Sequence, residues 1–205
     1  MSAAVWAAGG LLYHAGRAAR ARRVTFAGPR GNPAAGALYM FTTAMRPSHK
    51  ESVSRHPGAF VLGLVLHLAA LGALGGLAAI LLEPSWSSRL RIPLVAVALT
   101  GCAAAATMLV RRVANPVVRI LSVPDDFLAI GLAVAFLAML ALASSGLVPV
   151  AAAAVAASVL LFYVPLGKLR HMVFFFLARA DLGHRLGYRG VLPPARAAEP
   201  ARRRA

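Results

Sequence analysis

Residues 58–82 of the chain read GAFVLGLVLHLAALGALGGLAAILL, and this stretch decides the fold. It is 25 residues long and has no charged side chain. An α-helix rises about 1.5 Å per residue, and about 20 apolar residues cross the ~30 Å hydrocarbon core of a bilayer. The stretch therefore predicts a membrane-spanning helix, in which His67 is the one ionisable residue.

Further apolar runs stand on both sides of this stretch, separated by charged or turn-forming residues. Together they predict helices at about 3–16, 58–82, 93–110, 127–146 and 149–178. The resulting fold class is an all-α membrane protein with five transmembrane helices in an antiparallel bundle. Segment 3–16 has only 14 residues, so an interfacial position is the alternative for it.

The composition excludes two other classes of basic protein. Hydrophobic residues make up 60% of the chain and charged residues 14%, yet the net charge is +16. A disordered basic chain would not be so apolar, and a soluble nucleic-acid-binding domain would be basic throughout. Nucleic acid is therefore not an expected partner, whereas membrane lipid is. Cys102 is the only cysteine, which excludes an intrachain disulfide and a Cys-ligated metal cluster.

The basic residues fall almost entirely on one side of the predicted bundle. Of 22 Lys and Arg residues, 20 lie in segments 17–57, 111–126 and 168–205. The opposite side holds only Arg89 and Arg91. The positive-inside rule then predicts an N-out, C-in orientation with a cytoplasmic C-terminus in the cell inner (plasma) membrane.

Two segments outside the spans have compositions of their own. Residues 17–57 are predicted to form a basic cytoplasmic loop, in which the apolar segment 34–45 would lie on the membrane surface. Residues 193–205 are rich in Pro, Ala and Arg and are predicted to be a disordered basic tail. The remaining residues, 1–192, are expected to form a single membrane domain.

The histidines are the main candidates for functional side chains in this chain. The six are His14, His49, His56, His67, His171 and His184. His67 lies inside a span, where an ionisable side chain is a functional candidate by default. The alternative is a structural role, in which His67 forms a hydrogen bond to a neighbouring helix. His171 lies near the cytoplasmic end of the last predicted helix, so both fall in the cytoplasmic half of the membrane.

Two imidazoles from different helices can ligate one haem iron from opposite faces. Gly63 stands four residues before His67, where the lack of a side chain would admit a flat macrocycle. Lys168 and Arg170 precede His171 and would pair with haem propionates. The alternative role of these two cations is to anchor the helix end at the cytoplasmic surface.

Four stretches then resemble a known family. They are VLHL at 65–68, RRVANPVVRILSVPDDF at 111–127, PLGKLRH at 165–171 followed by FFF at 174–176, and the basic segment after the first apolar run. On these residues the chain resembles the haem b membrane subunit, gamma, of respiratory nitrate reductase. It is also similar to relatives in sulfite-reduction-associated and heterodisulfide-reductase-like membrane complexes.

The resemblance implies five helices, N-out and C-in, and electron transfer between a membrane quinone and an iron–sulfur or cytochrome subunit. It assigns His67 and His171 as axial ligands of the haem nearer the cytoplasm. A second ligand pair would fall near 75–78 and 152–154, where this chain has no histidine. We therefore expect one haem b, within a subunit that works in a quinol-linked complex rather than alone. A second haem or quinone site through His56 or His14 with His184 is the minor alternative.

Other functions have less support in the sequence. A haem-free anchor or assembly subunit of a redox complex is the main alternative. A transporter would require polar residues or broken helices at the membrane midplane, where this chain has Ala, Leu, Val and Gly. Asp125 and Asp126 are the only adjacent carboxylates, and their position at a helix start indicates dipole compensation more than quinone-linked proton transfer. We find no hydrolase triad and no phosphate-binding loop.

Overall fold

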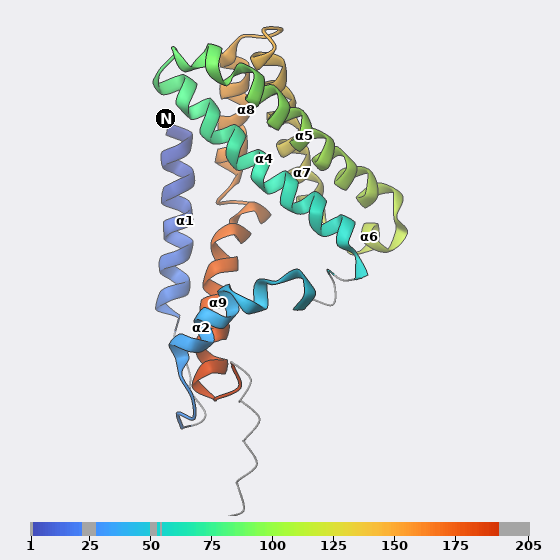
Figure 1. Ribbon diagram of the computed structural model, residues 1–205. Helices are drawn as coiled ribbons and strands as arrows, with labels where there is room; N and C mark the ends of the chain where they lie inside the picture. Colours follow the sequence, from blue (N-terminus) through green and yellow to red (C-terminus); the bar gives the residue numbers. More distant parts are fainter. Residues whose placement is uncertain (1, 22–27, 50–52, 54, 193–205) are drawn as a thin grey trace, which may run out of the picture. The chain divides into compact units, whose positions relative to one another are not determined.

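A computed structural model describes residues 2–21, 28–49, 53 and 55–192 (Figure 1). In this part of the chain every regular element is a helix. By its internal contacts the chain divides into two compact units. Unit 1 comprises Met1–Leu11 and His56–Arg170, and unit 2 comprises Leu12–Arg55 and His171–Ala205. The predicted disordered tail, 193–205, lies outside the described residues.

Unit 1 is a helical bundle. Its main helices are α4 (Pro57–Leu82), α5 (Trp86–Ala114), α7 (Pro124–Ser144) and α8 (Val150–Tyr163), with the short α6 (Pro116–Ile120) before α7. Each main helix packs on the next along the chain, and α4 and α5 lie side by side (Figure 1). The first half of α1 (Ser2–Arg20) also belongs to this unit, where Trp6 donates a hydrogen bond of 3.0 Å to the carbonyl of Phe162.

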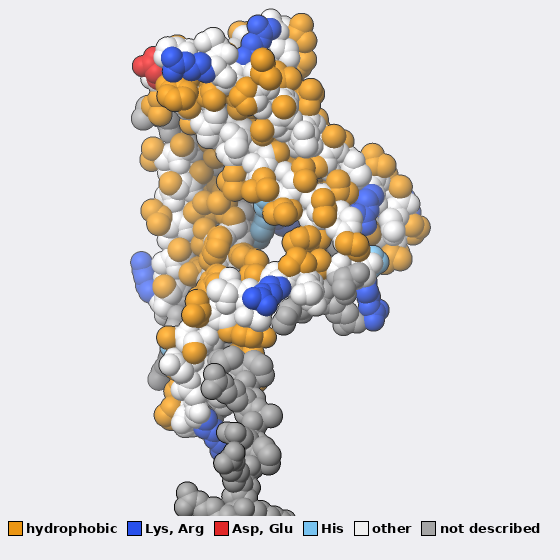
Figure 2. All heavy atoms as spheres, viewed as in Figure 1, with side chains coloured by type: hydrophobic (Ala, Val, Ile, Leu, Met, Phe, Trp, Pro, Cys, Tyr) orange, Lys and Arg blue, Asp and Glu red, His pale blue; other side chains and the backbone are white. Residues whose placement is uncertain are grey.

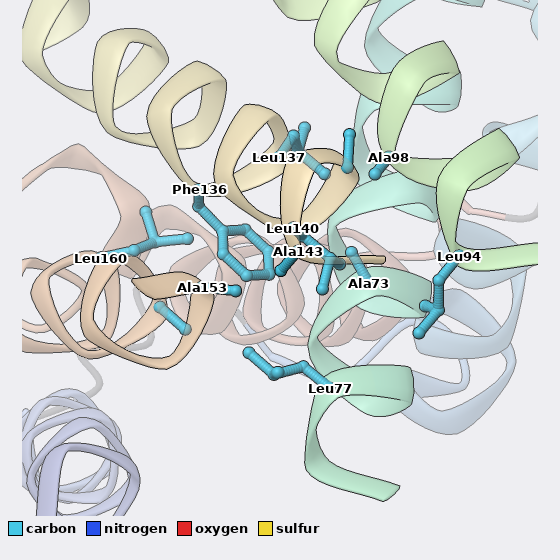
Figure 3. Close-up of a cluster of buried hydrophobic side chains, with 12 residues drawn as sticks. Ala73, Leu77, Leu94, Ala98, Phe136, Leu137, Leu140, Ala143, Ala153 and Leu160 are labelled. Carbon is cyan, nitrogen blue, oxygen red and sulfur yellow. The ribbon is translucent and has the colours of Figure 1, made fainter. Parts of the chain in front are cut away.

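The core of unit 1 pairs large side chains of α7 with small residues of its neighbours (Figure 3). Phe136 and Leu137 are completely buried. Around them lie Ala73 of α4, Ala98 of α5 and Ala153 of α8, which are equally buried. Small residues on the surrounding helices allow their backbones to come close to α7, as is common in membrane bundles.

Three helices, α4, α5 and α7, are long and apolar enough to cross a membrane. Helix α8 and the segment Lys168–Tyr188 are separated by a short break with a bend of 73°. If the two together count as one membrane span, the chain has a fourth candidate span. The structure thus supports three or four candidate spans by length and composition. Many large hydrophobic side chains on these helices are exposed, including Leu64, Leu68 and Leu71, and Figure 2 shows such side chains covering α4 and α5. This surface is compatible with lipid contact.

Helix α5 begins earlier than the sequence predicts. We expected a helix over 93–110, but α5 starts at Trp86 and contains Pro93. Arg89 and Arg91 are therefore helical and do not lie in a loop. The early start is stabilised because Leu90 and Leu94, one turn apart, both pack against the core. The missing N–H of Pro93 removes a single bond from the helix, which a packed membrane helix tolerates.

The last predicted helix is interrupted. We expected one helix over 149–178, but α8 ends at Tyr163 and is followed by the 3-10 turn η3 (Lys168–Arg170) and by α9 (His171–Tyr188). Pro165 has no N–H to continue the helix. The ring of Tyr163 instead lies against Gly167, where a side chain would collide with it, and the Tyr163 carbonyl accepts the N–H of Gly167 at 2.9 Å.

The segment predicted as a basic loop, 17–57, contains further helices. They are the end of α1, then α2 (Pro33–Phe41), η1 (Thr43–Met45) and η2 (Pro47–His49). The side chain of Asn32 caps α2 by accepting the N–H groups of Ala34 and Ala35 at 2.9 and 3.1 Å. Asn115 caps α6 in the same way, and a proline follows each asparagine at the first helical position.

Within unit 2, α2 and α9 meet at glycines. A Cβ atom on Gly36 would lie 2.6 Å from the Cα of Gly187, and a Cβ on Gly183 would lie 2.7 Å from the Cα of Ala37. Gly183 and Gly187 are four residues apart and therefore share one face of α9. The guanidinium of Arg179 adds a hydrogen bond of 2.9 Å to the carbonyl of Met40.

Candidate functional site

His67 lies on α4 with an exposed side chain, and its ring is fixed by the helix backbone. Nδ1 lies 2.6 Å from the carbonyl oxygen of Gly63. Because a carbonyl only accepts, Nδ1 is the protonated nitrogen and the lone pair of the neutral ring is on Nε2. Histidines that ligate a metal usually donate their other N–H to a carbonyl or carboxylate in this way. The same bond also satisfies a histidine in an apolar helix that binds nothing.

Gly63 shares the face of His67, as its spacing predicts. Apart from the backbone of α4 itself, no described atom lies within 4 Å of the position that a Gly63 Cβ would take. The surface of α4 beside His67 is therefore open toward the surroundings. That arrangement fits a flat ligand and fits lipid equally.

The second predicted haem ligand, His171, is the first residue of α9 and is exposed. It belongs to unit 2, whereas His67 belongs to unit 1. Arg170 precedes it as the last residue of η3 and is also exposed. Lys168 is thus the first residue of a 3-10 turn that leads into His171, and the two residues do not share one continuous α-helix.

Lys168 has a carboxylate partner. Its Nζ donates to both oxygens of Asp126, each at 2.8 Å. Asp126 also accepts the backbone N–H of Val123 at 3.0 Å, and Arg112 lies 3.6 Å away. The Asp126 side chain is only 12% exposed, whereas that of Lys168 is 47% exposed. The cation predicted to meet a haem propionate therefore already neutralises an acidic group of the protein.

Two further contacts extend this ion pair into a polar cluster. The Tyr163 hydroxyl donates to the Asp125 carboxylate, and Arg112 donates to the Ser122 hydroxyl at 2.8 Å. We define the polar cluster as Arg112, Ser122, Asp125, Asp126, Tyr163 and Lys168. It ties the end of α5 and the start of α7 to the residues that flank the interruption after α8.

Sequence reasoning did not bring this cluster together. Asp125 and Asp126 were expected to compensate a helix dipole, and they do lie in the first turn of α7. The sequence does not point to Tyr163, and Arg112 and Ser122 enter only as members of the stretch 111–127 that carries the family resemblance. One signal was present, because the chain has only six acidic residues and a carboxylate at the end of an apolar helix requires a partner.

The remaining candidate histidines are His14 and His184 in unit 2 and His56 in unit 1. The ring of His14 packs edge-on against Phe174, with centroids 5.8 Å apart. His184 stands ten residues after Phe174 on α9, which is about 15 Å of helix rise. The structure therefore does not bring His14 and His184 together. His56 precedes α4, and its carbonyl accepts the N–H of Ala59 at 3.2 Å.

Within the described ranges, no group of three or more His, Cys, Asp or Glu side chains is arranged to hold a metal ion. A haem iron requires only two axial protein ligands, so this finding leaves that cofactor open. Comparisons of the chain with models of protein families, with curated proteins and with solved structures gave no match.

Proposed function

We propose that the chain is the membrane cytochrome b subunit of a respiratory oxidoreductase complex. It would pass electrons between the quinone pool and a partner redox subunit through a single bis-His haem b. The observation that carries the proposal is the hydrogen bond from His67 Nδ1 to the Gly63 carbonyl at 2.6 Å, inside a candidate span. This bond directs the lone pair to Nε2, the nitrogen that an axial ligand uses.

In this proposal each residue has a defined role. His67 and His171 would hold the haem iron, which would supply a one-electron redox change. Arg170 is the propionate partner, since the charge of Lys168 is neutralised by Asp126. The open surface beside Gly63 admits the edge of the macrocycle.

The proposed topology has five spans, N-out and C-in. Helix α1 supplies the additional span, and the interrupted α8–α9 pair counts as the last one. The excess of Lys and Arg in 17–57, 111–126 and 168–205 supports a cytoplasmic position for these segments. That face would also dock the iron–sulfur or cytochrome partner, while quinone would reach the subunit from the lipid.

The test is a reduced-minus-oxidised absorption spectrum of the protein purified from cells supplied with haem precursor. We expect a b-type spectrum with one haem per chain. His67→Ala and His171→Ala should each remove bis-His ligation and the spectrum with it. Wild-type protein without haem, or a double variant that keeps the full spectrum, would refute the proposal.

His184→Ala is the matched control, because His184 is an exposed histidine on the same helix as His171. The spectrum and the haem stoichiometry should be unchanged in this variant. Loss of half of the haem would instead favour the second pair that uses His184.

A haem-free anchor subunit is the second candidate, and one observation favours it. Lys168 and Asp126 satisfy each other, and Nδ1 of His67 is bonded to its own helix, so these groups are stable without a cofactor. Affinity purification separates the two functions. An anchor retains its redox partner in the His67→Ala variant and shows no haem spectrum in the wild type.

A further inference from the structure

Arg89 and Arg91 are the two basic residues that the positive-inside pattern leaves unexplained. The guanidinium of Arg89 lies 5.9 Å above the ring of Trp86. Arg91 extends from α5 to the end of α7, where its Nε donates to the carbonyl of Ser144 at 3.1 Å and its Nη2 to that of Ser145 at 3.3 Å. The last carbonyls of a helix carry partial negative charge, so Arg91 stabilises the C-terminus of α7.

Arg91 also lines a cavity of about 280 Å³ in unit 1. The cavity lies where α4 and α7 end and where α5 and α8 begin, at the upper end of this unit in Figure 1. Its walls are apolar at Leu77, Leu140 and Val150. Its volume is many times the about 30 Å³ that one water molecule takes up in the liquid. It is close to the lower limit of ligand pockets, which is about 300 Å³.

The polar part of the cavity contains an unsatisfied hydroxyl. Ser144 Oγ is buried and has no hydrogen-bond partner among the described residues. Buried hydroxyls in folded proteins are almost always paired. Because Ser144 lines the cavity, a rotation of its side chain would bring this hydroxyl to a molecule bound there.

The side-chain charge of the cavity lining is positive, whereas the C-termini of α4 and α7 at the same end add carbonyl dipoles of the opposite sign. Ten residues line it, and Arg91 is the only charged one among them. Its guanidinium has five N–H donors, of which the α7 carbonyls occupy two. Ser87 and Ser88 also line the cavity from the first turn of α5, where the helix dipole is positive.

We propose that this cavity binds the phosphate group of an anionic phospholipid, held by Arg91, Ser144 and the serines of the first turn of α5. The cavity lies at the ends of three candidate spans, at the depth where lipid headgroups meet the protein. Leu82 and Ile92 stand within two residues of the lining residues Ile80 and Arg91 in the sequence, and their exposures of 78% and 80% provide apolar surface for the acyl chains. The proposal does not depend on whether the protein binds haem.

Native mass spectrometry of the purified full chain tests the site, after detergent delipidation and titration with phosphatidylglycerol. The wild type should retain one lipid. Arg91→Gln should weaken retention about tenfold, because hydrogen bonds to charged groups are the strong ones. Arg91→Gln also removes the α7 cap, so Ser144→Ala is the second variant. It leaves the backbone carbonyls in place and should weaken retention about fivefold.

Arg89→Gln is the matched control, since this arginine stands two residues from Arg91 but does not line the cavity. Retention in this variant should stay within about twofold of the wild type. Equal retention by all four proteins would overturn the proposal. If inorganic phosphate displaced the lipid as well as phosphatidylglycerol does, the site would be a free-anion site and the lipid assignment would be wrong.

Discussion

Asp126 and Asp181 are carboxylates in different surroundings. Asp126 receives both hydrogen bonds of Lys168 and the N–H of Val123, and its side chain is mostly buried. Asp181 pairs with Arg185 one turn along α9 at 2.7 Å, and these side chains are 35% and 46% exposed. A buried acceptor loses more when its partners change than an exposed one does, because water replaces the exposed contact.

Asp126→Asn should therefore lower the free energy of unfolding by about 1–3 kcal/mol. The amide cannot accept all the bonds of the carboxylate, and it leaves Lys168 and Arg112 without their counter-charge. Thermal unfolding in detergent, followed by circular dichroism, measures the change.

Asp181→Asn is the control, and its effect should stay below about 0.5 kcal/mol, since exposed pairs one helical turn apart contribute little. Equal destabilisation by the two substitutions would mean that the polar cluster has no special stability. At this scale the sequence predicted the position of Asp126 at a helix start, but not its partners. Lys168 stands 42 residues away, and no local pattern connects the two.

At the scale of elements, α2 and α9 pack with their backbones in contact, because glycines without side chains stand where the two helices meet. Gly36 and Gly187 face each other so closely that any Cβ would meet backbone atoms, which have little freedom to move. Backbone contact of this kind makes the fit of two helices specific, because larger residues are sterically excluded.

Gly36→Ala should separate these helices and destabilise unit 2 by about 1–3 kcal/mol, the usual cost of overpacking. Faster tryptic cleavage after Arg30, whose N–H donates to the carbonyl of Tyr188 at the end of α9 at 2.8 Å, would report the change. Gly16→Ala is the matched control. Its Cβ would meet only the side chain of Arg20 at 3.5 Å, and the better helix propensity of alanine should leave cleavage unchanged or slower.

The elements also show what the sequence could predict. Helix α4 runs from Pro57 to Leu82, as its apolar run indicates, because length and hydropathy are local properties. The interruption after Tyr163 differs from the predicted helix although Pro165 is a local signal for it, because a proline does not end every helix, as Pro93 within α5 shows. Helices that are apolar on all sides carry no pattern that identifies their packing face. The contacts of α7 with its neighbours could therefore not be predicted either.

At the scale of the whole molecule, charge asymmetry leads to a prediction of sidedness. In a Cys102→Ser background, Ser85→Cys and Leu147→Cys should react with a membrane-impermeant maleimide in intact cells. Both positions lie in turns at the end of unit 1 that has few basic residues, and both are exposed. The proposed orientation places this end outside the cytoplasm.

Ile120→Cys supplies the opposite readout. Ile120 ends α6 and is exposed, beside the basic residues of segment 111–126. It should react only after the cells are permeabilised. Labelling of Ile120→Cys in intact cells, with protection of Ser85→Cys, would mean that the orientation is opposite to the proposed one.

The glycine contact between α2 and α9 also sets an order of events during synthesis. Gly183 follows Gly36 by 147 residues. At about 5–20 residues per second, a ribosome takes roughly 7–30 s to add that length of chain. Helix α2 therefore waits for its partner while the helices of unit 1 are made. Unit 2 is the last part of the protein to mature, and synthesis that stops before α9 leaves the start of the chain without its counterpart.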